Sequence, residues 1–106
     1  MPDISTKIGS LELKNPLMSA SGTFGSGPEY EPFIDPGTLG AVVAKTVTPS
    51  PREGNPPPRT SETPSGLLNS IGLAGKGIDV FLENELPAMA KYGTRIIVNI
   101  AGSEPD

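Results

Sequence analysis

The sequence predicts an α/β fold in which short parallel strands alternate with helical or loop segments. Residues 41–44 and 96–98 are apolar runs without polar alternation, which is typical of strands buried on both faces. Residues 17–21 form a third run of small and apolar side chains. Long segments separate the three runs, and strands joined by such crossovers pair in parallel.

The N-terminal segment has a different pattern from these three strands. Its apolar residues alternate from 4 to 13 around Gly9-Ser10, which predicts a β-hairpin of two short strands. The segment 28–33 then allows about one helical turn, because Pro28 stands where proline is tolerated, at a first helical position. Asp35-Pro36-Gly37 is a turn signal before the next strand.

Two segments lie between the second and third parallel strands. Residues 48–66 show no helical or strand period, so we expect a long loop there. From Gly77 onward, apolar residues recur at a helical spacing up to Met89. Pro87 lies inside this pattern, and we expect it to break the helix into two pieces.

Composition indicates ordered segments joined by long structured loops. The chain has 106 residues, which suits one small domain or a piece of a larger one, and we treat 1–106 as one domain unit. Thirteen glycines and thirteen prolines are clustered between clean apolar runs. The hydrophobic fraction of 35% is low for a well-packed core.

Charge and residue types restrict the possible chemistry. The formal net charge is −4 and the eight Lys and Arg residues are scattered, so a nucleic-acid partner is not expected. With no cysteine and no histidine, no metal site is predicted and the commonest general base is missing. Lys, Asn, Ser, Thr, carboxylates, backbone amides or a cofactor must then supply any reactivity.

The sequence contains no apolar run of the length that a membrane span requires. The N-terminus also lacks the charged and then apolar pattern of a signal peptide. We therefore expect a cytoplasmic protein without a membrane partner.

Polar side chains follow each of the three predicted strands. Ser21 ends the first, Lys45 and Thr46 follow the second, and Asn99 follows the third. Ligands of parallel α/β folds bind at the carboxyl ends of the strands, so these ends together predict a site. Each residue taken singly also has an ordinary structural role, as a solvated strand end or a partner of loop amides.

Two other features were weighed as functional motifs. The segments GTFGSG and GLAGKG have the wrong glycine order for a dinucleotide or nucleotide-triphosphate loop, and they are interpreted as turns. The run Pro56-Pro57-Pro58 is compatible with a proline-rich interaction segment, which is the non-enzymatic alternative. That alternative requires an exposed, disordered segment.

Four stretches, in this order, resemble the N-terminal part of the class 1 dihydroorotate dehydrogenases, flavoproteins of pyrimidine biosynthesis. They are NPLMSASGTFGSGPEY, GAVVAKTVTPSPREGNPPPR, ETPSGLLNSIGL and IVNIAG. The residues of these stretches are most similar to those of the type B enzymes, which pair with an iron–sulfur flavoprotein subunit carrying FAD and reduce NAD. The related barrel of dihydropyrimidine dehydrogenases is an alternative, but the GNPxPR loop favours dihydroorotate.

The resemblance implies the N-terminal portion of a TIM (β/α)8 barrel, with FMN across the carboxyl ends of the strands. It implies that FMN is contacted by Ala20, Ser21, Lys45, Thr46 and Asn99. It implies that dihydroorotate or orotate is bound by Lys45, Asn69, Ser70, Ile71, Gly72 and Leu73. Homodimers are also implied, together with the electron-transfer subunit if the enzyme is of type B.

The chain departs from the family pattern in its length and in its lack of cysteine. A TIM barrel typically has roughly 250 residues and eight strands, whereas about three parallel strands are predicted here. The catalytic base of the family is a cysteine on a later loop, so no catalytic residue is assigned here and the base is expected beyond Asp106. We therefore expect an N-terminal fragment of the enzyme, inactive by itself.

Overall fold

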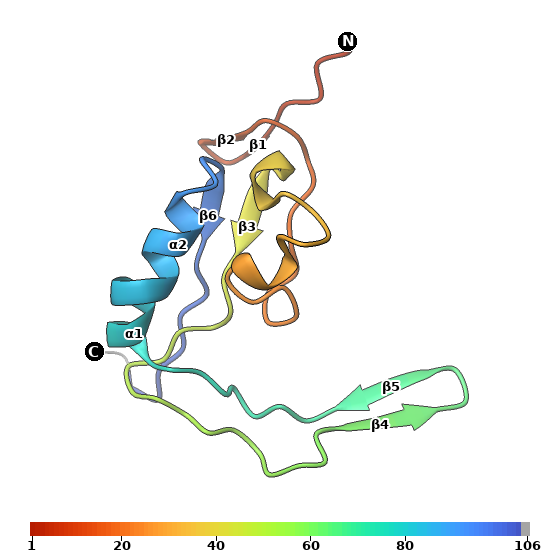
Figure 1. Ribbon diagram of the computed structural model, residues 1–106, viewed down its shortest axis with the longest axis vertical. Coiled ribbons are helices and arrows are strands. Elements are labelled where there is room, and N and C mark those ends of the chain that lie inside the picture. Colours follow the sequence, from red (N-terminus) through yellow and green to blue (C-terminus); the bar gives the residue numbers. More distant parts are fainter. Residues whose placement is uncertain (105–106) are drawn as a thin grey trace.

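The computed structural model describes residues 1–104, which form three two-stranded sheets and one helical segment that lies beside β3 (Ala41–Val43) and β6 (Arg95–Ile97) (Figure 1). The other strands are β1 (Thr6–Ile8), β2 (Leu11–Leu13), β4 (Thr60–Thr63) and β5 (Gly66–Asn69). The helical elements are η1 (Pro28–Tyr30), η2 (Pro36–Thr38), α1 (Ile78–Val80), η3 (Phe81–Glu85) and α2 (Leu86–Ala90).

The centre of the fold is the parallel pair β3 and β6. Val42 of β3 pairs with Ile96 of β6, and Val43 pairs with Ile97. The predicted parallel arrangement of these two strands is therefore confirmed. Each observed strand ends one residue earlier than predicted, and β6 also begins one residue earlier, at Arg95.

The predicted strand at 17–21 is present only as a single parallel bridge, between Met18 and Ala41. Its position beside β3 is as expected, but it lacks a regular ladder. The Ser19 hydroxyl accepts the Val43 N–H at 2.8 Å, in the place that a backbone carbonyl would take in a ladder. Competition of this kind from a serine side chain explains why the strand is not continuous.

A helical segment packs on the β3–β6 pair and forms the core with it (Figure 1). Val42 and Met89 are fully buried, and Phe81 is 4% exposed. The buried cluster contains Leu39, Val42, Ala44, Val47, Phe81 and Met89. Since the helical spacing predicted from Gly77 places Phe81 and Met89 on one face, this part of the prediction is confirmed.

The helical segment runs without a break from Ile78 to Ala90, so the expected division into two pieces at Pro87 is wrong. Pro87 has no N–H to donate, and its ring would clash with the carbonyl four residues earlier in a regular α-helix. The wider π turn of η3, directly before α2, gives room for that ring. No helix within residues 1–104 has both the length and the apolarity of a membrane-spanning one.

The predicted N-terminal hairpin is confirmed. β1 and β2 are antiparallel, with Ile8 opposite Leu11 and only Gly9-Ser10 between them. Gly9 has a φ of +59°, a conformation that glycine adopts without strain. The predicted turns at 28–33 and 35–37 are present as η1 and η2.

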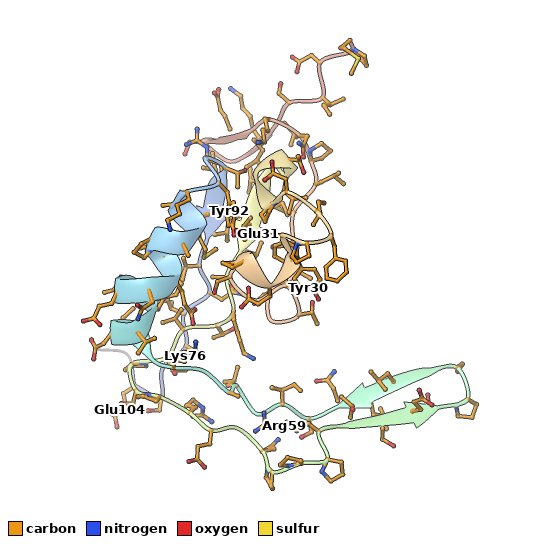
Figure 2. All side chains as sticks on the ribbon, viewed as in Figure 1. Tyr30, Glu31, Arg59, Lys76, Tyr92 and Glu104 are labelled. Carbon is orange, nitrogen blue, oxygen red and sulfur yellow. The ribbon has the colours of Figure 1, made fainter. Side chains whose placement is uncertain are left out.

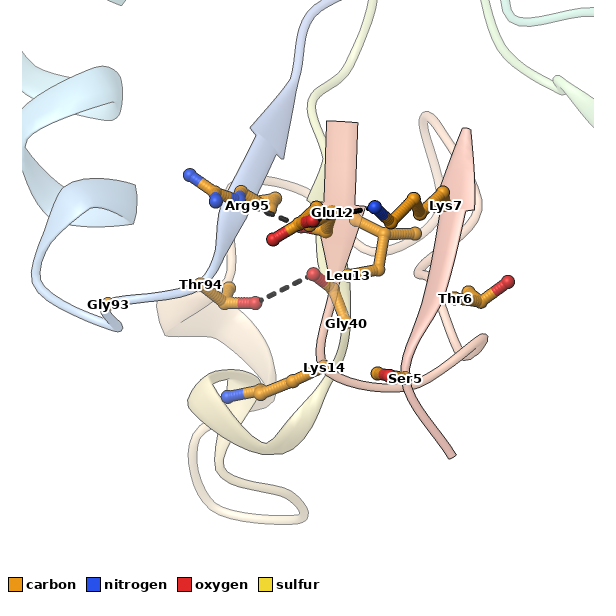
Figure 3. Close-up of a pocket in the computed structure, with 10 residues that line it drawn as sticks. All are labelled: Ser5, Thr6, Lys7, Glu12, Leu13, Lys14, Gly40, Gly93, Thr94 and Arg95. Carbon is orange, nitrogen blue, oxygen red and sulfur yellow. Dashed lines mark hydrogen bonds and ion pairs between the residues drawn. The ribbon is translucent and has the colours of Figure 1, made fainter. Parts of the chain in front are cut away.

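The hairpin lies against the N-terminal ends of β3 and β6 and borders a hollow of about 530 Å³ (Figure 3). Arg95 Nε donates to the Glu12 carbonyl at 3.0 Å. The Thr94 hydroxyl donates to the Gly40 carbonyl at 3.0 Å. These bonds attach the hairpin and the start of β6 to the end of the sheet opposite the predicted ligand site.

Tyr92 connects the end of α2 to the segment that follows η1 (Figure 2). Its hydroxyl donates to a Glu31 carboxylate oxygen at 2.6 Å, and its ring lies where a side chain on Gly27 would stand. Burial, the Glu31 hydrogen bond and the charges of Glu31, Glu29 and Asp35 all raise the pKa of the Tyr92 phenol. The folded state therefore holds the phenol proton more tightly than the unfolded chain does.

We expect Tyr92→Phe to lower the stability of the fold by about 1 kcal/mol at neutral pH, because one hydrogen bond to a carboxylate is lost. The raised pKa stabilises the fold at every pH below the unfolded tyrosine value near 10, and this contribution falls as pH rises above it. Thermal unfolding across that pH range should show a smaller alkaline loss for the variant.

Tyr30→Phe is the matched control, because Tyr30 stacks on Phe24 with ring centroids 4.7 Å apart and its hydroxyl makes no hydrogen bond within residues 1–104. Equal alkaline losses in the two variants would contradict the role given to Tyr92.

Candidate functional site

The carboxyl ends of the three strand segments lie side by side. The Ser21 hydroxyl donates to the Ala44 carbonyl at 2.9 Å, which joins the end of the first segment to the end of β3. The Val47 N–H donates to the Asn99 carbonyl at 2.9 Å, which joins the extension of β3 to that of β6. The predicted convergence of these strand ends is therefore present.

Residues 52–75 form a long arm that leaves the body and returns to it (Figure 1). Arg52 and Gly75 exchange two backbone hydrogen bonds of 2.9 Å at its base. β4 and β5 pair antiparallel at its tip, with Thr60 opposite Asn69. The expectation of a loop without regular structure over 48–66 is thus wrong in part, because β4 lies within it. All residues of β4 and β5 are exposed, and β4, whose sequence is TSET, carries no apolar period that could have revealed it.

Two polar side chains hold the arm between its base and its tip. Arg59, labelled in Figure 2, donates from Nε to the Asn55 carbonyl at 2.6 Å and from Nη2 to the Glu53 carbonyl at 2.8 Å. The Asn55 amide donates to the Ser70 hydroxyl at 2.7 Å. These bonds order the segment on both sides of the three prolines, which removes the disorder that a proline-rich interaction segment requires.

Close backbone approach explains two glycines of the arm. Gly54 has a φ of +77°, and a Cβ there would lie 2.3 Å from the Ile71 carbonyl oxygen. Gly72 has a φ of +81°, and a Cβ there would lie 2.7 Å from the Asn55 nitrogen. Leu73, which follows, has a φ of +54°, a conformation that side chains other than glycine adopt at a cost.

A hollow of about 570 Å³ lies between the strand ends and the arm. One side comes from the strand ends and carries hydroxyls and a cation, and the other comes from the arm and is largely apolar with one amide. The residues that line it are Ser21, Gly22, Thr23, Lys45, Thr46, Thr60, Leu67, Asn69, Ile71 and Leu73. The polar wall with Lys45 favours a ligand that carries a negative charge.

Six of the predicted site residues meet at this hollow: Ser21, Lys45, Thr46, Asn69, Ile71 and Leu73. Four others do not line it: Ala20, Ser70, Gly72 and Asn99. On β5 the arm contributes Leu67 and Asn69 but not Leu68, because successive side chains of a strand point to opposite faces. The Ser70 hydroxyl instead accepts a hydrogen bond from the Asn55 amide, and Gly72 has no side chain to contribute.

Four lining residues were not predicted: Gly22, Thr23, Thr60 and Leu67. Thr60 shares the face of Asn69 as its cross-strand partner, and Leu67 shares that face because it lies two positions before Asn69 on β5. A period of two from Leu67 to Leu73 is present in the sequence and could have identified Leu67. Thr60 could only be found once the pairing of β4 with β5 was known.

Lys45 is the cation of the hollow. Its side chain is half-buried, and the ion pairs within residues 1–104 join Lys7 to Glu12 and Lys76 to Glu85, so Lys45 takes part in neither. A half-buried ammonium group outside these pairs attracts a negatively charged ligand more strongly than a paired one does.

A neighbouring hollow of about 510 Å³ shares Lys45 and lies between the 22–30 segment and the helical segment. The buried Ser26 hydroxyl donates to the Glu85 carboxylate at 3.1 Å, and the Ser26 N–H donates to Glu29 at 3.2 Å. These contacts fix the segment that follows Ser21 against η3. They thereby hold one side of the candidate site in place.

Comparisons with known proteins identify one family. The family model described as dihydroorotate dehydrogenase matches residues 3–106. The dihydroorotate dehydrogenase B (NAD(+)), catalytic subunit, of Thermoanaerobacter sp. (strain X514) is 55% identical over 100 residues, covering 94% of this chain and 33% of the relative.

Proteins of the same name from other bacteria give similar matches. The protein of Bacteroides thetaiotaomicron is 50% identical over 103 residues, which cover 97% of this chain and 34% of the relative. That of Thermodesulfovibrio yellowstonii is 49% identical over 106 residues, covering all of this chain and 35% of the relative. The chain thus spans about a third of the length of the curated relatives that it matches.

We expect Gly54→Ala to disrupt the base of the arm, at a cost of about 1–3 kcal/mol, because the new Cβ would collide with the Ile71 carbonyl in a strained backbone conformation. Amide hydrogen exchange within residues 52–75 should become faster. Gly66→Ala is the control, since a Cβ there meets nothing closer than the Thr63 hydroxyl at 3.7 Å. Unchanged exchange in the Gly54 variant would refute this explanation of the arm.

Proposed function

The chain belongs to the dihydroorotate dehydrogenase family, and on that basis we propose that it forms one third of a flavoenzyme that oxidises dihydroorotate to orotate in pyrimidine biosynthesis. The observation that carries the proposal is the hollow in which Lys45 from a strand end faces Asn69 from the arm. Dihydropyrimidine dehydrogenase, the related alternative, is less well supported because the matches carry the dihydroorotate name.

The proposed enzyme is a TIM (β/α)8 barrel, and residues 1–106 supply its first strands. β3 and β6 are parallel neighbours separated by a helical segment, which is the repeating unit of such a barrel. The site lies at the carboxyl ends of these strands, where active sites of this fold occur. The β1–β2 hairpin lies at the opposite end, near Gly40 and Arg95, as a cover for the barrel bottom.

FMN is the proposed cofactor, bound on the strand-end side of the hollow. Bound FMN would accept the hydride equivalent that leaves dihydroorotate. The groups present fit a ring that gains electrons on reduction, because the Thr46 hydroxyl can donate a hydrogen bond and Lys45 offers a positive charge. The Ser21 hydroxyl donates to the Ala44 carbonyl, and its oxygen can still accept a hydrogen bond. The resemblance also assigns Ala20 and Asn99 to FMN. Ala20 directly precedes Ser21 in the chain, and the Asn99 carbonyl accepts the Val47 N–H at the neighbouring strand end.

The substrate is proposed to lie between the cofactor and the arm. Asn69 presents a donor and an acceptor in one plane, which suits the amide-like edge of a pyrimidine ring. Lys45 would attract the carboxylate, and the backbone of residues 70–73 would supply further hydrogen bonds. The proton that leaves the substrate requires a base, which the resemblance to the family implies is a cysteine. This sequence contains no cysteine, so we propose that the base lies in another part of the enzyme.

We also propose the partners that the relatives' name suggests. The matched proteins are catalytic subunits of a B-type, NAD(+) enzyme. An electron-transfer subunit carrying an iron–sulfur centre and FAD is the expected partner, and a homodimer is the expected form of the catalytic subunit. The proposed enzyme acts in the cytoplasm.

A hybrid enzyme tests the proposal: residues 1–106 replace the matching third of the Thermoanaerobacter relative. We expect the hybrid to purify with FMN and to oxidise dihydroorotate. Lys45→Ala should lower kcat/KM on the order of 100-fold, because an electrostatic contact to developing charge is lost. Lys91→Ala, which removes an exposed cation outside the hollow, is the control. Equal activity of the two variants would argue against the assigned role of Lys45.

The chain alone is expected to bind little FMN and to show no oxidation of dihydroorotate. Most of the barrel is missing from it, and β3 and β6 leave edges and apolar surface without partners. Absorbance spectra of the purified chain after incubation with FMN check this expectation. A stable yellow complex would contradict it.

A further inference from the structure

Leu67 is an apolar side chain in a position that the fold itself does not explain. It lies on the exposed strand β5, where 59% of it is accessible, and it packs in no part of the buried core. Leu68, its neighbour, is 65% exposed. A single exposed leucine is ordinary. Two adjacent leucines on one strand point to opposite faces of the two-stranded tip, so they have different surroundings.

The register of the tip separates the two leucines. Leu67 stands opposite Glu62 and two positions before Asn69, so it shares the face of Asn69. Leu68 stands opposite Ser61 and points to the other face. In agreement with this, Leu67 lines the hollow beside Lys45 and Asn69, and Leu68 does not.

We propose that Leu67 is the apolar wall on which the ring of the substrate rests, and that it contributes to selection of a flat heterocycle. This inference rests on the proposed function. Lys45 and Asn69 can satisfy the charge and one polar edge of a carboxylated pyrimidine, but neither covers the face of its ring. Leu67 and Ile71 are alternate residues of the same arm and supply the apolar surface for that face.

The amount of surface available is enough to affect binding. Covering most of a leucine side chain that is 59% exposed removes apolar area from water, and this is favourable in proportion to the area. Loss of this contact should weaken binding about tenfold. The loss should appear in KM for dihydroorotate and in the dissociation constant of orotate, with little change in kcat, because a resting surface contacts substrate and transition state alike.

The test compares Leu67→Ala with Leu68→Ala in the hybrid enzyme, with orotate binding measured by titration and FMN content by absorbance. Leu67→Ala should weaken orotate binding about tenfold, and Leu68→Ala should leave it unchanged. Both variants should retain the FMN content of the unmodified hybrid. Leu67→Met, which keeps the apolar volume, should restore most of the affinity.

The outcomes distinguish the two levels of the proposal. Orotate binding that is equal with and without the Leu67→Ala change, or equally weakened by Leu68→Ala, overturns the role of Leu67 and leaves the proposed function standing. A hybrid that binds FMN normally but no orotate at all overturns the proposed function, and the role of Leu67 with it.

Discussion

Burial of β3 under the helical segment is the interaction on which the site depends. Val42 and Met89 are fully buried in one hydrophobic cluster, and Phe81 belongs to the same cluster. Because β3 is fixed in this way, its continuation carries Lys45 and Thr46 to a defined edge of the sheet. Hydrogen bonds on both sides of β3, from the Ser21 hydroxyl to the Ala44 carbonyl and from the Val47 N–H to the Asn99 carbonyl, then bring Ser21 and Asn99 to the same edge.

The arm is organised by polar contacts instead of a core. Its tip is exposed on both faces, so apolar burial contributes little to its order. Arg59 donates to the Asn55 and Glu53 carbonyls on its own side of the arm, and the Asn55 amide donates across the arm to the Ser70 hydroxyl. Gly54 permits the close approach at the base of the arm. Hydrogen bonds from a charged guanidinium to carbonyls are among the stronger polar contacts, which suits a segment that must hold its shape in water.

Sequence patterns predicted the buried parts of this protein and the N-terminal hairpin, and they missed the exposed strand pairing of the arm. The apolar runs at 41–44 and 96–98 and the helical spacing that includes Phe81 report burial directly, and the structure confirms these elements. β4 has no buried face, so no periodicity could reveal it. The effect of Pro87 was misjudged because a π turn, which depends on the geometry of several residues together, accommodates its ring.

The candidate site was predictable to a similar extent. The strand-end rule identified Ser21, Lys45 and Thr46 from position alone, and these residues line the hollow. Asn69 came from the resemblance, and Thr60 needed the strand pairing. Asn99 was predicted by the same rule, yet its side chain is exposed and outside the hollow, because the rule places a residue at an edge and does not orient its side chain.

The full exposure of β4 and β5 has a consequence for how such a protein can change over generations. A substitution at the tip disturbs no packed neighbour, so most replacements there leave folding intact. Residues on the inner face of the same tip line the hollow. Ligand preference can therefore drift through mutations at the tip while selection for a stable fold acts elsewhere, on the residues beneath the helix.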